Sequence, residues 1–295
     1  MRLAITGGTG LVGRFLVEEA LAAGDRVTVL TRRPPAPGFF SGAVDHAAFD
    51  LGGPPPALDG MDALIHAGLS HVPGKYRGGE GDDPEGFLSA NRDGTLRLFE
   101  AAARAGVGRV IFLSSRAVYG GYPPGTELTE EMPPRPDTLY GKVKAEAEAA
   151  LADLRGGVAL RATGVYGPAG PGQRHKWADL FDNFLAGGEI VPRRGTEVHG
   201  EDLAAAARIL LTAPEERLGE GVFNVSDILL DRRDLLAEVA RATGCAHPLP
   251  PASDAPVSVM RCHRLRALGW RPGGMPRLRA SLPALLRGLA GARRP

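Results

Sequence analysis

Three scarcities limit what this chain can be. It has two cysteines, Cys245 and Cys262, too few for a disulfide scaffold and without the paired spacing of a zinc site. No run of about 18 apolar residues occurs that could span a membrane. Neither sign of charge is in excess, because the chain has 35 Lys and Arg and 34 Asp and Glu, which gives a net charge of +1. We therefore expect reduced thiols, no metal, no membrane or nucleic-acid partner, and a cytoplasmic protein.

Glycine and proline are abundant instead. They number 41 and 25 in 295 residues, above the usual frequencies of about 7% and 5%. They fall at turns and form no repeat, which excludes a low-complexity chain. Apolar residues make up 43%, so the chain can build one large or two modest globular domains.

The amino-terminal segment predicts a dinucleotide site. An apolar run at residues 3–6 is followed by a glycine turn and then by an amphipathic stretch that ends at Gly24. Strand, glycine turn and helix in this order bring backbone N–H groups and a helix N-terminus against a pyrophosphate, where a side chain would block the approach. We expect the turn to bind the cofactor through Gly7, Gly10, Leu11, Val12 and Gly13.

The end of the second strand bears on the choice of cofactor. An NAD-specific fold usually presents a carboxylate there to the ribose 2′-hydroxyl. Here the strand at 26–30 is followed by Thr31, Arg32 and Arg33. Guanidinium groups suit a 2′-phosphate through charge-assisted bonds, so we predict NADP, with NAD as the alternative. Other candidates follow the third and fourth strands: Asp50 and Leu51 at the adenine edge, and His66, Ala67 and Gly68 beneath the cofactor. We expect His66 to be a packing residue rather than a base.

A phenol and an ammonium are spaced for proton transfer. Residues 137–154 carry apolar side chains at helical intervals, and Tyr140 and Lys144 are four residues apart, so their side chains share one face. Lowering the pKa of a free tyrosine from about 10 to 7 needs roughly 4 kcal/mol, part of which a nearby ammonium supplies. Ser115 follows a buried strand at 109–113, where ligand sites of parallel sheets form.

Six groups of residues occur in a fixed order along the chain: Gly7 to Gly13, Ile65 to Gly68, Asn91 to Thr95, Ser114 to Gly120, Tyr140 to Lys144, and Leu160-Arg161 with Val165 to Pro168. In order and spacing they resemble the extended short-chain dehydrogenases, and within them the NAD-dependent epimerase/dehydratase family. The resemblance continues to Trp270 and so covers nearly the whole chain.

The resemblance implies roles for particular residues. Ser115 would be the hydroxyl that binds the substrate oxygen, and Tyr140 the acid/base. Lys144 would bind the nicotinamide ribose and lower the tyrosine pKa. Asn91, in an expected helix at 84–105, is counted with the cofactor-binding residues. The family's usual homodimer packs the helices of Asn91 and Tyr140 against their mates, and alanines such as Ala101 and Ala149 on their outer faces would permit close approach.

The alternation of strands and helices implies a doubly wound parallel sheet, the Rossmann fold, with a smaller C-terminal mixed domain. We assign residues 1–163 with 190–226 to the dinucleotide-binding domain and 164–189 with 227–295 to the substrate domain. Helices are expected at 173–186, 202–212 and 231–243, and residues 265–270 and 279–289 complete the small domain.

Two departures from the family pattern concern the substrate. Arg116-Ala117 follow Ser115 where the dehydratase branch has an Asp-Glu pair, which disfavours dehydration. Gly164 stands where nucleotide-sugar members usually have an Asn that serves the diphosphate. Basic residues could instead line an anion pocket, or they could be solvated surface charge: Arg116, Arg174, His175, Lys176, Arg193 and Arg194.

These features predict an NAD(P)-dependent oxidoreductase or epimerase that moves hydride between the nicotinamide and an alcohol or ketone carbon of a small, sugar-like or anionic substrate. Net redox and epimerisation share one set of motifs. A nucleotide-sugar epimerase and a non-catalytic NADP-sensing protein remain alternatives.

Overall fold

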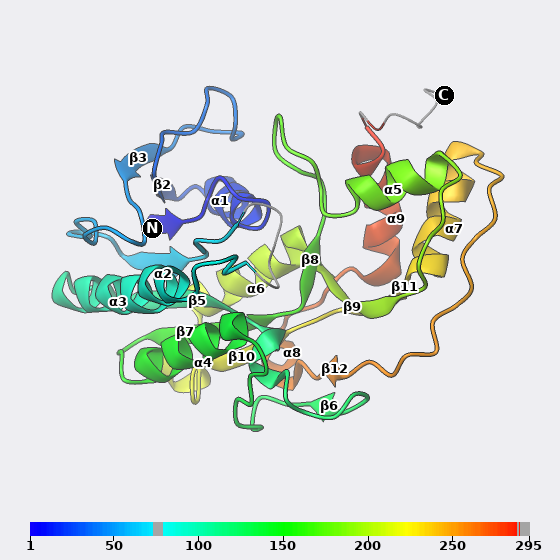
Figure 1. The fold of residues 1–295 in the computed structure, drawn as a ribbon. Helices are drawn as coiled ribbons and strands as arrows, with labels where there is room; N and C mark the ends of the chain where they lie inside the picture. Colours follow the sequence, from blue (N-terminus) through cyan, green and yellow to red (C-terminus); the bar gives the residue numbers. More distant parts are fainter. Residues whose placement is uncertain (73–78, 288, 290–295) are drawn as a thin grey trace.

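The computed structural model describes residues 1–72, 79–287 and 289. Its centre is a parallel sheet of seven strands in the order β10-β7-β5-β4-β1-β2-β3 (Figure 1). From β1 the chain winds outward through β2 and β3, then returns to β4 and winds the other way. The switch point between β1 and β4 is where doubly wound sheets bind ligands. The strands are β1 (Arg2–Thr6), β2 (Arg26–Thr31), β3 (Asp45–Ala48), β4 (Ala63–His66), β5 (Arg109–Ser115), β7 (Gly157–Ala162) and β10 (Val222–Val225).

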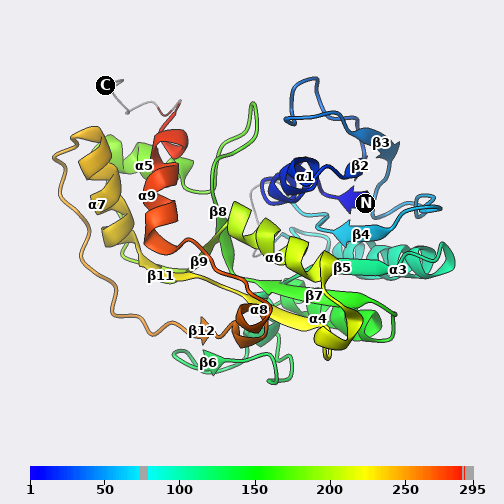
Figure 2. The same ribbon diagram turned by 180° about the vertical axis from the view of Figure 1, so that it is seen from behind.

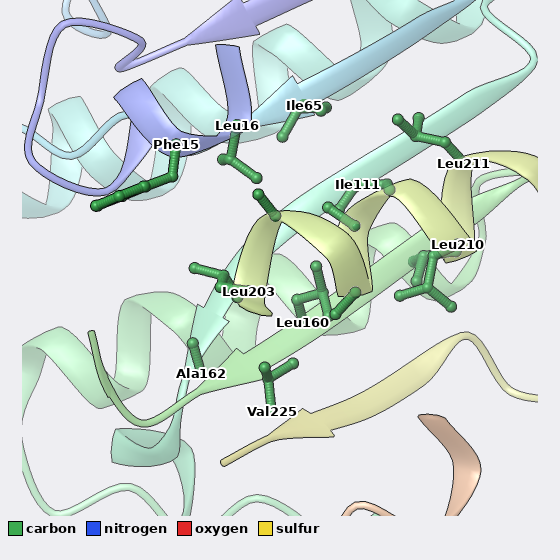
Figure 3. Close-up of a cluster of buried hydrophobic side chains, with 14 of the residues drawn as sticks. Phe15, Leu16, Ile65, Ile111, Leu160, Ala162, Leu203, Leu210, Leu211 and Val225 are labelled. Carbon is green, nitrogen blue, oxygen red and sulfur yellow. The ribbon is translucent and has the colours of Figure 1, made fainter. Parts of the chain in front are cut away.

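Helices cover both faces of this sheet (Figures 1 and 2). On one face lie α1 (Gly13–Ala22) and α6 (Gly200–Thr212), and on the other α2 (Pro84–Leu88), α3 (Gly94–Arg104) and α4 (Leu139–Ala152). Figure 3 shows Leu16 of α1 and Leu203 of α6 facing strand residues such as Ile111 and Leu160. The nearly continuous apolar strands reflect this burial on both faces.

A smaller unit stands at the carboxyl edge of the sheet. Three strands, β8 (Gly164–Tyr166), β9 (Arg194–His199) and β11 (Ile228–Asp231), form a second sheet. Next to it α5 (Ala178–Leu185), α7 (Arg232–Thr243) and α9 (Gly274–Leu285) share an apolar cluster around Phe181, Leu236 and Leu278. Two further short strands, β6 (Glu127–Leu128) and β12 (Val259–Met260), pair with each other. The helix α8 (His263–Ala267) follows β12.

Two expected helices differ from the sequence pattern. The helix expected at 84–105 is interrupted by a π-helical turn, Ser89–Asp93, whose Asn91 side chain bonds the backbone of Phe87 and Ser70. The helix expected at 173–186 begins only at Ala178, because the preceding segment reaches across to the first domain, where the Gln173 amide donates to Thr9 O at 2.8 Å. Among the described helices, none is both long and apolar enough to cross a membrane.

Candidate active site

A groove of about 810 Å³ opens at the carboxyl ends of the first strands. The glycine turn after β1 forms one wall and the segment after β4 the opposite one. The groove therefore lies at the topological switch point, as the sequence predicts. Its lining includes Gly7, Gly10, Leu11, Val12, Gly13, Arg32, Arg33, Asp50, Leu51, Ala67, Gly68 and Ser70.

The glycine turn packs too tightly for side chains. Gly7 has a φ of +68°, and a Cβ there would lie 2.8 Å from the carbonyl carbon of Ala67. A Cβ on Gly13 would overlap the carbonyl oxygen of Gly7. Bare backbone is thus needed for the turn to fit against the end of β4.

The rim of the groove at the end of β2 is basic. Arg32 is 81% exposed in its side chain, and its Nε lies 4.0 Å from Asp50 Oδ2. Arg33 lines the same part of the groove. An ion pair this exposed contributes little to stability, so the Arg32 guanidinium can exchange its carboxylate for a ligand at small cost.

His66 is fully buried behind the groove rather than in it. Its Nδ1 bonds Thr6 Oγ1 at 2.6 Å and its Nε2 bonds Thr95 Oγ1 at 2.9 Å. Burial, reinforced by the charge of Lys144, lowers the pKa of His66 to about 3, so the ring is neutral. The ring packs in the interior, and its neighbours Ala67 and Gly68 line the groove. The place of His66 beneath a cofactor stays a prediction.

Asn91 supports the groove from below. Its Nδ2 donates to Ser70 O and its Oδ1 accepts from Ser70 N, both at 2.7 Å. Ser70 lines the groove, and the π-turn is what turns the amide toward it. Such turns are frequent at functional sites.

A glycine lets the first turn of α4, which carries Tyr140, approach the segment that follows Ser115. Ser115 ends β5 and caps the short 3-10 helix Arg116–Tyr119, with its Oγ accepting from Ala117 N at 3.1 Å. Tyr140 lies in the first turn of α4. A Cβ on Gly141 would lie 2.5 Å from Ala117 O, so glycine at 141 lets this turn of α4 approach the segment that follows Ser115.

Lys144 lies one turn further along α4 and is only 4% exposed. Its Nζ donates to Leu113 O at 2.7 Å, and lies 4.5 Å from the centre of the Phe112 ring and 5.8 Å from that of Tyr140. Burial lowers the pKa of Lys144 to about 7, against an opposing effect of Glu148. The side chain thus joins β5 to the tyrosine.

Sequence reasoning missed a buried ion pair behind Lys144. Glu148 accepts from Arg161 of β7, through Nη2 at 2.7 Å and Nε at 3.0 Å, and from Ser114 Oγ. Arg161 Nη1 also donates to Tyr119 Oη at 2.6 Å. The four-residue spacing of Tyr140, Lys144 and Glu148 in α4 was a signal that could have pointed to it.

Two of the basic substrate candidates, Arg174 and Arg116, have partners elsewhere. Arg174 bridges Asp179 at 2.7 Å and Asp182 at 2.8 Å on α5. Arg116 donates to Ser258 O at 3.1 Å, and burial lowers the pKa of His175. Arg194 begins β9. An anion pocket made from these residues stays a prediction, and the acids around Arg174 compete with any such ligand.

Gly164 has a charged pair beside it. Ala162, two residues earlier, pairs with Ser115, so Gly164 lies just beyond the end of β5 and β7. A Cβ at Gly164 would lie 2.6 Å from both Glu197 Oε2 and Lys176 Nζ, which form an ion pair. Burial raises the pKa of Glu197. Within the part of the chain that the structure describes, no cluster of His, Cys, Asp or Glu could hold a metal ion.

Two curated relatives each match half of the chain or slightly more. The dTDP-6-deoxy-L-talose 4-dehydrogenase (NAD(P)(+)) of Kitasatospora kifunensis is 37% identical over 181 residues, which cover 58% of this chain and 54% of that protein. The uronate dehydrogenase of Pseudomonas syringae pv. tomato is 32% identical over 149 residues, which cover 50% and 51%. The chain thus spans about half the length of these relatives.

Solved structures match over almost the full chain. UDP-glucose 4-epimerase of Thermus thermophilus, in complex with NAD, superposes with a TM-score of 0.77 at 27% identity, covering 98% of this chain and all (100%) of that one. MoeE5, in complex with UDP-glucuronic acid and NAD, gives 0.77 at 26% identity with the same coverage. The model of the NAD dependent epimerase/dehydratase family matches residues 3–226. The chain therefore belongs to the NAD-dependent epimerase/dehydratase family.

Proposed function

We propose that this protein is an NAD(P)-dependent oxidoreductase or epimerase that acts on an alcohol carbon, or the corresponding ketone, of a small sugar-like substrate. The observation that carries the proposal is the position of Lys144. Its buried Nζ is held by Leu113 O near the end of β5 and lies beside the Tyr140 ring. A cation is thus fixed next to a phenol, at the strand end that also carries Ser115.

The groove supports a nicotinamide dinucleotide as cofactor. The turn from Gly7 to Gly13 offers backbone without side chains at the N-terminus of α1, which suits a pyrophosphate. Asp50 and Leu51 would meet the adenine edge, and Ala67 and Gly68 would lie beneath the cofactor. When bound, the nicotinamide accepts hydride from the substrate carbon or returns it.

NADP is the cofactor we favour over NAD. Arg32 and Arg33 line the groove at the end of β2, where a 2′-phosphate would lie. A phosphate would compete with Asp50 for the exposed Arg32 guanidinium, and the phosphate carries more charge.

Three side chains would divide the proton chemistry among them. Ser115 Oγ would hold the substrate oxygen. Tyr140, as phenolate, would take the hydroxyl proton during oxidation and give it back during reduction. The Lys144 ammonium would stabilise the phenolate and bind the ribose hydroxyls. In an epimerase the same groups would return the proton after hydride has been returned to the opposite face of the bound ketone.

A compact substrate is favoured over a nucleotide sugar. Gly164 offers no side-chain amide to a diphosphate, and the space beside it holds the pair of Lys176 and Glu197. These charges would meet hydroxyl or carboxylate groups of a small substrate just beyond Ser115. The nucleotide-sugar epimerase remains the second candidate, because MoeE5 and the Thermus epimerase have the same fold.

Assembly and organisation are also proposed. All strands of the large sheet lie within residues 2–162 and 222–225, which supports a dinucleotide-binding domain of residues 1–163 with 190–226. Of the strands in these ranges, β9 pairs in the three-stranded sheet of the smaller unit and β6 pairs with β12. The apolar cluster of α5, α7 and α9 supports a substrate domain of residues 164–189 with 227–295. We propose a cytoplasmic homodimer.

The test is a screen for turnover. Purified protein with NADP or NADPH is mixed with sugar nucleotides, free sugars, sugar acids and small ketones, and absorbance of the reduced cofactor is followed together with product stereochemistry. Net cofactor conversion would identify an oxidoreductase, and inversion without net conversion an epimerase. Tight cofactor binding without turnover across all four classes would favour the sensing protein.

A further inference from the structure

A chain of buried polar groups extends behind the Tyr140–Lys144 pair. Glu148 follows Lys144 by one helical turn and is 7% exposed, and Arg161 of β7 is 3% exposed. Arg161 donates to the Glu148 carboxylate through Nε and Nη2, and Ser114 Oγ donates to the same carboxylate. Buried carboxylates held this firmly act as fixed negative charges.

The charges in this cluster do not cancel. Arg161 is a cation, Lys144 is a second cation when it is protonated, Glu148 is an anion, and burial keeps His66 on β4 neutral. Tyr140 on α4 and Tyr119, which follows β5, are the remaining titratable groups around the pair. Burial raises the pKa of Tyr119, whose hydroxyl accepts from Arg161, so this phenol stays protonated.

We propose that Glu148 is a positioning residue, held by Arg161 and Ser114, whose negative charge raises the protonated fraction of the buried Lys144 at neutral pH. Without it, the burial of Lys144 against Phe112 and Leu113 would favour the neutral amine, which could not stabilise a phenolate. When Lys144 is protonated, the cluster carries one surplus positive charge, which the ionised Tyr140 would balance. The role of this charge in catalysis rests on the proposed function. The effect of Glu148 on the protonation of Lys144 does not.

Direct measurement is possible because the chain has only four lysines, Lys75, Lys142, Lys144 and Lys176. The full-length protein labelled with ¹³C-lysine would give four side-chain Cε signals by NMR, and the one missing in Lys144→Met belongs to Lys144. Titration from pH 5 to 10 then reports its pKa in the wild type and in variants.

The expected result is a drop. In Glu148→Gln, loss of the adjacent anion should lower the pKa of Lys144 by about one unit or more. A residue that only holds the fold together would act in the opposite direction, because loosened packing admits water and returns a lysine toward its ordinary 10.5. An unchanged or raised pKa would therefore overturn the proposal.

A second variant covers the case in which Glu148→Gln does not fold because Arg161 is left buried without a counter-ion. Glu148→Gln combined with Arg161→Gln removes both charges, and a smaller drop is expected, because the loss of the Arg161 cation offsets part of the effect. The matched control is Glu238→Gln on α7. Glu238 is also 7% exposed and paired with Arg241 and Arg279, but it belongs to another helix cluster. Its replacement should leave the Lys144 signal unchanged.

The outcome can be told apart from failure of the proposed function. If Glu148→Gln lowers the pKa of Lys144 but Tyr140→Phe keeps its activity, the effect of Glu148 on Lys144 is confirmed and the catalytic role proposed for Tyr140 is wrong. If Tyr140→Phe loses activity while Glu148→Gln leaves the pKa of Lys144 unchanged, the proposed enzymatic function is supported and the role proposed for Glu148 is wrong.

Discussion

The ammonium nitrogen of Lys144 lies 5.8 Å from the centre of the Tyr140 ring, one turn away on the same helix. If Tyr140 carries the proton, Tyr140→Phe removes one oxygen and leaves the packing volume almost unchanged. Turnover should fall at least about 100-fold, since general acid/base catalysis contributes roughly 10²- to 10⁴-fold. The rate is measured on the substrate found in the screen.

Cofactor binding controls for damage to the fold. Tyr140→Phe should bind the reduced cofactor as the wild type does in a fluorescence titration. A variant that turns over substrate at nearly the wild-type rate would show that Tyr140 belongs to an ordinary helix surface.

The second prediction concerns cofactor choice. NADPH should bind at least about tenfold tighter than NADH, and Arg32→Ala should remove most of that preference, because a charge-assisted bond contributes about 1.5 to 3 kcal/mol. Both cofactors are titrated by fluorescence. Equal affinities in the wild type, or a preference that survives the substitution, would restore NAD as the cofactor.

The third prediction links Lys144 to stability. Its folded pKa of about 7 lies below its ordinary 10.5, so between these values the unfolded chain binds the proton more strongly and stability rises with pH. Lys144→Met abolishes this. At pH 7 the variant should be more stable than the wild type in urea unfolding, and the difference should shrink by about 2 kcal/mol toward pH 9.

The same variant should bind the cofactor more weakly, because the ribose loses its ammonium partner. Glu238→Gln, far from this cluster, should leave the pH dependence of stability as it is in the wild type. A Lys144→Met protein whose stability follows pH in parallel with the wild type would contradict the burial of a titrating lysine.

A homodimer is the fourth prediction, with a mass by light scattering near twice the 30.9 kDa of one chain. Ala149 of α4 is exposed, as the proposed dimer requires. Ala101 of α3, expected on the outer face, instead packs in the core at 9% exposure. A substitution of Ala149 by Arg should shift the protein toward monomer, and a wild-type mass near that of one chain would reject the dimer.

Local patterns in the sequence are enough for several parts of this protein. Gly7 and Gly13 follow an apolar strand and precede a helix, and the turn they form needs only short-range geometry. Tyr140 and Lys144 share a helix face because four residues make about one turn. The interrupted helix around Asn91 could not be foreseen in this way, because the contact that accompanies the interruption is with Ser70, far away in the chain.

The sequence by itself determined the glycine turn and the spacing of the phenol and the ammonium, because each depends on neighbours within a few residues. It also determined the parallel sheet, because apolar strand patterns alternate with helical patterns along the chain. Only the tertiary structure decided the charge states: it buries His66 as a neutral ring and places Arg161 of β7 against Glu148 of α4. It also puts Lys176 and Glu197 into the space beside Gly164. The charge state and solvation of a side chain depend on which distant segments pack together. A sequence pattern shows which face of an element is buried, but it does not show which segment packs against that face.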